Sequence, residues 1–495
     1  MKVLHTKWLI SAGFLLVILV SFLMHGSIFK RELTGFHVWR QTETQNTILS
    51  FAHEDPSIFN PRRNERGAGD GIFRMEFPLM QWLFSKPVRW GADPLVVARY
   101  GDFLVGLLTL LGMGFLTRNV FKNAGWGMLA VALMAFTPLF YYYTLNPLPD
   151  LMALCLTVWG LWLFVRFRRE RKYWLWGLSV GLIALAGLVK LPYVLYMGLH
   201  FYSIFISNHK HDERSSLWIR LLTLLVLLAP VAAWYAWVIP GWKGNGITRG
   251  VLNMSDVQRT QYFYYLWYHL RTTLPELLIG WPAMILFVPG LVIAVQKFRK
   301  HPKDYWIWLI PPVALILLIL FELNMIETHH DYYFMPLLPY LVLITILGAR
   351  WLYERSGHIT RLVLISLVVI GLGFSTYFRI QPRWDRIGFN PDWLTYKMEL
   401  RRAIPEGALV IAGNDVSHHI FLYYLNRNGW VFEHNWLTED ELRSAITHGC
   451  RFMVSDTRAV DGNPQFIKYF GTEVDRFGSI RIFTLKEISD MPDIH

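Results

Sequence analysis

The sequence is poor in cysteine and in charged residues. It has two cysteines in 495 residues, and charged residues make up 17% of the chain. Cys155 falls inside an apolar run and Cys450 in a polar segment, so we expect no disulfide between them. So few charges beside 54% hydrophobic residues exclude an ordinary soluble composition.

Long apolar runs are what the chain has in abundance. Each is long enough, at about 1.5 Å per residue, to cross a hydrocarbon core of about 30 Å. We therefore predict a polytopic α-helical membrane protein with about eleven spans. They are expected near residues 7–28, 95–116, 127–145, 149–165, 173–189, 191–207, 217–239, 276–296, 305–323, 333–350 and 361–378. The first run lacks a clean cleavage site and is expected to be retained.

The basic residues set the predicted orientation. A net charge of +12 is compatible with a nucleic-acid partner, but Lys and Arg collect in short loops between spans, as in "RFRRERK" from Arg166 and "KFRKHPK" from Lys297. By the positive-inside rule these loops face the cytoplasm, with the N-terminus. The long segments 29–94 and 240–275 and the C-terminus then lie outside. We expect contact with membrane lipids and no nucleic acid.

After about residue 380 the apolar runs become short. "ALVIAG" and "RFMVSD" are typical of buried strands, and "TEDELRSAI" has Thr438 and Glu441 at capping-box spacing. We predict a transmembrane domain over 1–380 and a small extracytoplasmic α/β domain over 381–495. The second domain lacks a Gly-rich phosphate loop and Cys/His metal spacing, so its sequence assigns it no chemistry.

Ionisable residues gather on the predicted outer side. The free energy of inserting such a group at membrane depth is unfavourable by about 2.5 to 3.5 kcal/mol, so these groups are usually paired, solvated or functional. They are Arg40, Glu43, Glu76, Asp150, Lys190, Glu327, His329 and His330.

Each of these residues also has an ordinary interpretation. Glu43 fits an exposed loop carboxylate neutralised by Arg40. Lys190 fits a side chain that reaches to the lipid head groups. Asp150 fits a helix N-terminal charge favoured by the helix dipole. Taken singly, none of them establishes a site.

The stretch "HHDYY", His329 to Tyr333, suggests a metal site, but adjacent histidines lack the one-face spacing of a chelating pair. The tyrosines fit an aromatic belt at the membrane surface better. They are Tyr141, Tyr142, Tyr143, Tyr332 and Tyr333. The sequence requires no cofactor; a divalent metal is left open without a ligand pattern in its favour.

Several short motifs together resemble a known superfamily. They are an acidic residue in the loop after the first span, "EFPLMQWL" at Glu76, "NPLPD" at Asp150, "LVKLP" at Lys190 and "HHDYYFMPLLPYL". Over about residues 1–380 the chain resembles the polytopic GT-C glycosyltransferases, and within them the bacterial members related to protein mannosyltransferases and aminoarabinose transferases (glycosyltransferase family 39-like).

The resemblance implies a function and roles. Such enzymes transfer a sugar from a polyprenyl-phosphate carrier to an acceptor hydroxyl outside the membrane, here a bacterial inner (plasma) membrane. The catalytic base would be Glu43, although "TET" replaces the frequent Asp-Glu pair, with Glu76 as runner-up. Asp150 would be a further acidic site residue. The donor phosphate would be bound by Lys190, with Arg40 as second candidate. Beyond the resemblance, the need of a departing phosphate for cations adds His329 and Arg271 as further candidate phosphate ligands. The acceptor stays open among glycan, lipid and protein.

The chemistry of the transfer agrees with these roles. A departing phosphate needs cations, and a weakly nucleophilic hydroxyl needs one carboxylate to take its proton. A single displacement would invert the anomeric centre. The alternative is a transporter or flippase of lipid-linked glycans, which would have charged or helix-broken sites near the midplane in matched halves. The segment 251–276 is predicted to form an interfacial amphipathic helix.

Overall fold

The computed structural model describes residues 2–205, 214–242, 250–253 and 256–488. The chain divides into two compact units. The first contains Met1–Phe29, Met75–Met80 and Arg99–Pro382, and the second contains Lys30–Arg74, Gln81–Ala98 and Arg383–His495. The second unit thus combines most of the first long loop with the C-terminal segment. The predicted domain boundary at 380/381 and the side of the membrane on which each part lies stay predictions.

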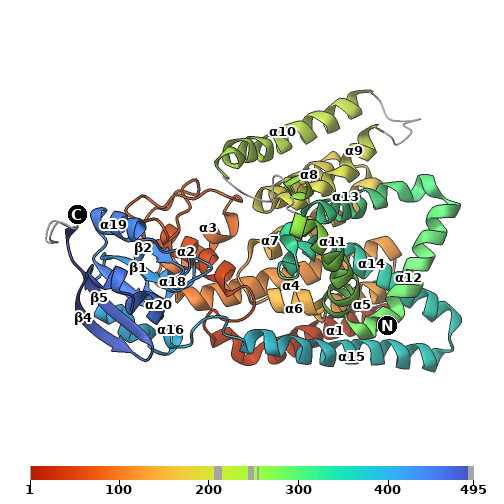
Figure 1. The fold of residues 1–495 in the computed structure, drawn as a ribbon. Helices are drawn as coiled ribbons and strands as arrows, with labels where there is room; N and C mark the ends of the chain where they lie inside the picture. Colours follow the sequence, from red (N-terminus) through yellow and green to blue (C-terminus); the bar gives the residue numbers. More distant parts are fainter. Residues whose placement is uncertain (1, 206–213, 243–249, 254–255, 489–495) are drawn as a thin grey trace. The chain divides into compact units, whose positions relative to one another are not determined.

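The first unit is a bundle of helices (Figure 1). The helices wholly or mostly in it are α1 (Lys2–His25), α4 (Pro94–Phe121), α5 (Ala124–Ala135), α6 (Pro138–Tyr143), α7 (Pro149–Glu170), α8 (Tyr173–Val189), α9 (Gly198–Phe205), α10 (Arg214–Val238), α11 (Asp256–Tyr268), α12 (Trp281–Lys300), α13 (Pro302–Ile326), α14 (Leu338–Arg355) and α15 (His358–Asp385). Tighter or wider turns join them: the 3-10 segments η1 (Gly26–Lys30), η2 (Leu191–Met197), η3 (Ile239–Gly241), η5 (Gly250–Asn253) and η7 (Asp331–Leu337), and the π-helix η6 (His269–Ile279).

Eight helices among the described residues are long and apolar enough to cross a membrane. They are Ala12–Lys30, Pro94–Phe121, Pro149–Glu170, Leu217–Gly241, Trp281–Lys300, Trp308–Ile326, Asp331–Arg355 and Ile359–Asp385. The polytopic helical fold is therefore as predicted.

The other three expected spans consist of shorter helices. The run 127–145 divides into α5 and α6 at Pro138, because a proline cannot continue the hydrogen-bond ladder of the preceding helix but suits the first turn of a new one. The run 173–189 is α8. The described part of the run 191–207 is η2 followed by α9, and residues 206 and 207 lie outside the described residues. The count of eleven spans and their orientation stay predictions.

Glycine permits a close contact between α12 and α14. A Cβ atom on Gly290 of α12 would lie 2.0 Å from the carbonyl oxygen of Ile344, and one on Gly348 of α14 would lie 1.8 Å from that of Leu286. The two backbones therefore touch directly, an arrangement that small residues allow in membrane helices.

The second unit is built on a five-stranded sheet, blue in Figure 1, with the strand order β2-β1-β3-β5-β4. The strands are β1 (Leu409–Gly413), β2 (Asn428–Phe432), β3 (Phe452–Ser455), β4 (Phe470–Phe477) and β5 (Ile480–Leu485). Strands β2, β1 and β3 run parallel, and β5 is antiparallel to both β3 and β4. The two predicted strands are β1 and β3, and the predicted capping box of Thr438 and Glu441 begins α19.

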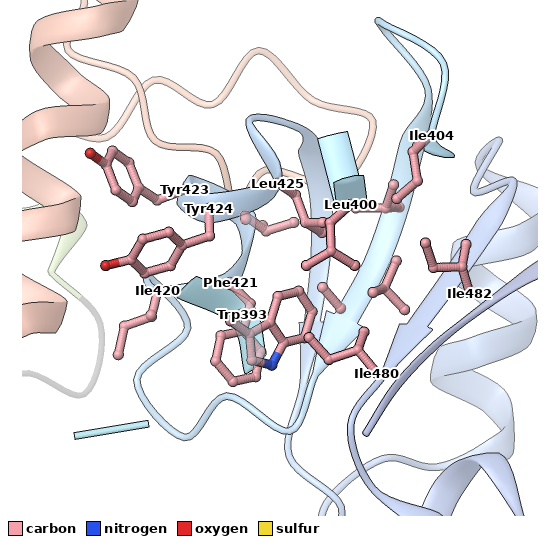
Figure 2. Packing of buried hydrophobic residues seen from close by; sticks show 14 of the residues in the cluster. Trp393, Leu400, Ile404, Ile420, Phe421, Tyr423, Tyr424, Leu425, Ile480 and Ile482 are labelled. Atoms are coloured by element: carbon pink, nitrogen blue, oxygen red, sulfur yellow. The ribbon is translucent and has the colours of Figure 1, made fainter. Parts of the chain in front are cut away.

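Helices cover the sheet and extend the second unit into the first long loop. They are α2 (Val38–His53), α3 (Leu79–Arg89), α16 (Asp392–Thr395), α17 (Lys397–Ala403), α18 (Phe421–Leu425), α19 (Glu439–Thr447), α20 (Arg458–Asp461) and α21 (Pro464–Ile467). One core centres on Trp393 and Phe421, whose rings stack with centroids 4.0 Å apart (Figure 2). Leu33 and Val38, from the first loop, are buried in this same core.

Candidate functional site

Lys190 lies where α8 ends. Its backbone is extended, with φ −154° and ψ 112°, and Pro192 follows two residues later at the start of η2. Because the helix stops at this residue, the side chain leaves the helical surface and enters the bundle. Only 5% of the residue is exposed. The interpretation of Lys190 as a side chain that reaches the lipid surface is therefore wrong.

Two carboxylates hold the ammonium group of Lys190. Its Nζ donates a hydrogen bond to Oε1 of Glu76 at 2.7 Å and lies 3.7 Å from Oδ2 of Asp150. Asp150 is in the first turn of α7 and is 1% exposed. Charges buried this deeply are stable in a protein only when they are paired. Three residues that the sequence predicted as site residues are thus brought together.

Aromatic rings complete the surroundings of Lys190. Its Nζ lies 5.4 Å from the ring centroid of Tyr332 and 5.3 Å from that of Tyr333, within the range of cation–π attraction. The hydroxyl of Tyr143 donates to Oδ1 of Asp331 at 2.6 Å, and both residues are buried.

This placement corrects the expected aromatic belt at the membrane surface. Tyr141, Tyr142 and Tyr143 are fully buried, and Tyr332 is 3% exposed. Their rings pack inside the first unit: the ring of Tyr141 stacks on that of His25 with centroids 3.9 Å apart, and the ring of Tyr143 packs edge-on against Tyr142 and Tyr332.

Lys190, Glu76 and Asp150 together form an ion group. A cavity of about 310 Å³ opens beside it. Its polar lining is Lys190, Glu76 and Glu322, together with Tyr235 and Tyr333. The remaining lining is largely apolar: Met75, Leu191, Pro192, Val194, Leu195, Trp242 and Leu318. The cavity thus has a charged part and an apolar part, which suits a ligand with a charged head and a hydrocarbon chain.

Glu322 is a site residue that the sequence analysis missed. It lies inside α13, in the apolar run "LILFELNMI", and is 5% exposed. The signal was present, because an acidic residue within a membrane span is rare and usually functional. Glu322 differs from the predicted site residues in its position, because it lies within a span and they lie at span ends or in loops.

Arg40 and Glu43 form a separate pair in the second unit. They lie three residues apart on α2, and the guanidinium Nη1 of Arg40 donates to Oε2 of Glu43. Each residue is 8% exposed. The interpretation of Glu43 as an exposed loop carboxylate is therefore wrong: the polar stretch around it is a buried helix. That this pair and the Lys190 group form one site stays a prediction.

The two other predicted phosphate ligands lie outside the cavity lining. His329 has a 66% exposed side chain, and its Nδ1 is 3.8 Å from Oε2 of Glu327. Arg271 lies on η6 and is exposed. Their proposed role stays a prediction. Among the described residues, no group of three or more His, Cys, Asp or Glu side chains is arranged to hold a metal ion.

Comparisons with known proteins address the fold. A family model described as dolichyl-phosphate-mannose-protein mannosyltransferase matches residues 76–237, the region that contains Glu76, Asp150 and Lys190. A comparison with curated protein sequences gives no match. Among solved structures, ArnT from Cupriavidus metallidurans in the apo state is similar with a TM-score of 0.64 and 12% identity, over 100% of both chains. The chain has the GT-C fold.

Two further GT-C structures are similar. The apo oligosaccharyltransferase of Archaeoglobus fulgidus matches with a TM-score of 0.61 and 14% identity, over 99% of this chain and 76% of the other. The arabinofuranosyltransferase AftD from Mycobacteria matches with 0.55 and 14%, over 97% of this chain and 41% of AftD. The resemblance drawn from the short motifs is thus confirmed at the level of the GT-C fold.

Related structures contain lipid phosphates. ArnT has been solved bound to undecaprenyl phosphate, and the A. fulgidus oligosaccharyltransferase AglB in complex with an inhibitory peptide and a dolichol-phosphate. These ligands combine one phosphate head with a long hydrocarbon chain.

Proposed function

We propose that this chain is a membrane glycosyltransferase that moves a sugar from a polyprenyl-phosphate carrier to an acceptor hydroxyl. The observation that carries the proposal is Lys190, a buried cation at the charged part of a largely apolar cavity in a GT-C fold. The cavity chemistry matches the lipid phosphates that ArnT and AglB bind. As in the sequence analysis, we place the reaction on the outer face of a bacterial inner membrane.

Lys190 is proposed to hold the donor phosphate. A sugar phosphate already contains its leaving group, so the main requirement is positive charge near the departing oxygen. The ammonium group has three donors, and Glu76 occupies one of them at 2.7 Å. Incoming phosphate oxygens would therefore share the ammonium with Glu76 or displace it. Leu191, Leu195 and Leu318 would contact the first isoprene units.

Glu43 is proposed to take the proton of the acceptor. The acceptor oxygen attacks the anomeric carbon as the bond to the phosphate oxygen breaks, the bonding electrons leave with the phosphate, and the hydroxyl proton passes to the carboxylate. A single displacement of this kind inverts the anomeric centre. Arg40 fixes the orientation of Glu43 on α2, which leaves Glu43 at a defined position to act on the acceptor.

The proposal is tested by sugar transfer in membranes that contain the protein. Radiolabelled sugar is supplied on a panel of polyprenyl phosphates, with hexosyl and pentosyl members, to wild type, Glu43→Gln and Glu327→Gln at matched expression. Glu327→Gln is the control, because it is the same substitution at a side chain that is 41% exposed and does not line the cavity.

We expect transfer by wild type and by the control, and its loss in Glu43→Gln. Transfer that survives in Glu43→Gln would keep the enzyme class and move the base to Glu76 or Asp150. No transfer from any donor, in membranes supplemented with lipid, glycan and peptide acceptors, would refute the proposal in favour of a transporter of lipid-linked glycans.

A further inference from the structure

Helix α2 bears Glu43. The segment that leads into its N-terminal end is attached to helices α17 and α18 of the C-terminal segment. The hydroxyl of Tyr424, on α18, donates to the carbonyl oxygen of Leu33 at 2.5 Å. Lys397 Nζ donates to Oε1 of Glu32 at 2.6 Å. Leu33 and Val38 are buried in the core shown in Figure 2, whose other members come from the C-terminal segment. The entry into α2 is therefore fixed by residues nearly four hundred positions later in the chain.

The first turn of α2 packs on the C-terminal segment as well. Helix α2 contacts α18 directly. The ring of Trp39, next to Arg40, stacks on His419 with centroids 5.9 Å apart. These contacts restrain rotation of the helix about its own axis, and that rotation decides where the carboxylate of Glu43 points.

The C-terminal side of α2 is tied to the edge of the sheet. Glu54, the C-cap residue directly after α2, accepts a hydrogen bond from Nη1 of Arg66 at 2.7 Å. The backbone nitrogens of Arg66 and Gly67 donate to the carbonyl oxygen of Gly429 at 3.0 and 2.8 Å, and the nitrogen of Gly429 donates to Asn64 at 3.1 Å. The first loop thus continues the sheet beyond β2.

Glycine at position 429 allows β2 to pair closely with β1. Its φ is +149°, and a Cβ atom there would lie 1.9 Å from the carbonyl oxygen of Val410 in β1. A side chain would therefore force β2 away from its neighbour.

We propose that the C-terminal sheet and its helices form a positioning element of the transfer reaction, which holds α2 so that Glu43 is presented to the acceptor. The inference rests on the proposed function and gives the C-terminal segment a role in it. Tyr424 is the positioning residue that we test. A displacement of a reacting group by 1 Å can cost on the order of a hundredfold in rate, so even a small shift of α2 is measurable.

The chain supplies a matched control for Tyr424→Phe. Tyr469 is in the same unit, is 1% exposed against 0% for Tyr424, and its hydroxyl donates to Oε1 of Glu439 at 2.5 Å. It belongs to a second core of the C-terminal segment, in which no first-loop residue takes part among the described residues. Tyr469→Phe therefore removes a hydroxyl with the same hydrogen-bond length from the same unit, without touching the attachment of α2.

The experiment measures kcat, the donor KM and the thermal stability of wild type, Tyr424→Phe and Tyr469→Phe as full chains. We expect both variants to melt at lower temperature than wild type. In Tyr424→Phe we expect kcat to fall on the order of tenfold with the donor KM unchanged, because a shifted base impairs the chemical step and not donor binding. In Tyr469→Phe we expect both constants to stay at the wild-type value.

Equal kcat in the two variants would overturn the inference and leave the proposed function standing. A wild type without sugar transfer would instead contradict the proposed function. If Tyr424→Phe does not fold, His419→Ala replaces it, since His419 is half-buried and its contact with Trp39 is a ring stack. The same fall in kcat at constant donor KM is then expected, and a wild-type kcat would overturn the inference.

Discussion

Glu76→Gln is the substitution that tests the ion group most directly, because it separates a counter-ion from a base. Glu76 accepts the 2.7 Å hydrogen bond of Lys190. Glutamine keeps the size of the side chain and an oxygen that accepts this hydrogen bond, but it removes the negative charge. Asp150, at 3.7 Å, still balances the ammonium when no ligand is bound. We therefore expect the variant to fold.

The size of the effect follows from the charges that share one ammonium group. A phosphate oxygen bound to Lys190 would lie about 5 Å from the Glu76 carboxylate, where two unit charges repel by about 1 kcal/mol in water and about 3 kcal/mol at an effective dielectric constant of about 20. Removing the carboxylate removes this repulsion. We expect polyprenyl phosphate to bind about 5- to 150-fold more tightly to Glu76→Gln than to wild type.

The assay is equilibrium binding of undecaprenyl phosphate to the purified chain in detergent. Because the lipid phosphate is also the product of transfer, its inhibition constant in the transfer assay should fall by the same factor. Glu327→Gln, which removes a carboxylate outside the cavity lining, should bind as wild type does. Unchanged or weaker binding by Glu76→Gln would refute the counter-ion role.

Three further predictions concern Lys190, the capping box and pH. Lys190→Met should weaken undecaprenyl phosphate binding at least about tenfold, because a charge-assisted hydrogen bond is lost; unchanged affinity would remove Lys190 from the site. Thr438→Ala should lower the free energy of unfolding by about 1 kcal/mol, measured by denaturant unfolding, because the cap of α19 is lost; an unchanged value would mean that the cap contributes nothing. His418 Nδ1 lies 3.4 Å from Oε1 of Glu65, and this hydrogen bond raises the pKa of His418 above 6.5. Burial raises the pKa of Glu65, but His418 and Arg63 lower it more, so that it lies below 4.5. Both groups are therefore charged between the lowered pKa of Glu65 and the raised pKa of His418, and the pair's contribution to stability is lost as pH rises through the pKa of His418. The difference in melting temperature between wild type and His418→Gln should be larger at pH 6 than at pH 8.5, and a difference independent of pH would contradict this.

Local patterns predicted the parts of the fold that local interactions determine. A run of apolar residues has to be buried in lipid or protein wherever it lies, so the bundle followed from composition. The cap of α19 depends on two residues three positions apart, and Thr438 and Glu441 were recognised in the sequence for that reason. The break of the run 127–145 at Pro138 was missed, although the proline was visible, because hydropathy alone set the span.

Contacts between distant segments were not predictable in the same way. The stretch around Glu43 has no amphipathic pattern, and its helix packs on residues from the other end of the chain, such as His419. The pairing of Gly429 with residues 64–67 depends on a sheet edge that exists only in the folded unit. A sequence pattern shows which residues need partners and leaves the partners open. The attachment of α2 to the C-terminal segment therefore became apparent only in the structure.

The two candidate bases now differ in a way that an experiment can separate. Glu43 and Glu76 are both paired with a cation, Arg40 in one case and Lys190 in the other, so pairing alone does not choose between them. Their cations differ in surroundings: Lys190 lines a largely apolar cavity, which we propose as the lipid phosphate site, whereas Arg40 lies beside Glu43 on one helix. Charge removal at a base lowers kcat and leaves ligand affinity unchanged, whereas charge removal at a counter-ion of the phosphate site raises affinity. If Glu43→Gln loses turnover and Glu76→Gln gains affinity, each carboxylate has the role assigned here. The reverse result would make Glu76 the base and would leave the Arg40–Glu43 pair with a structural role in α2.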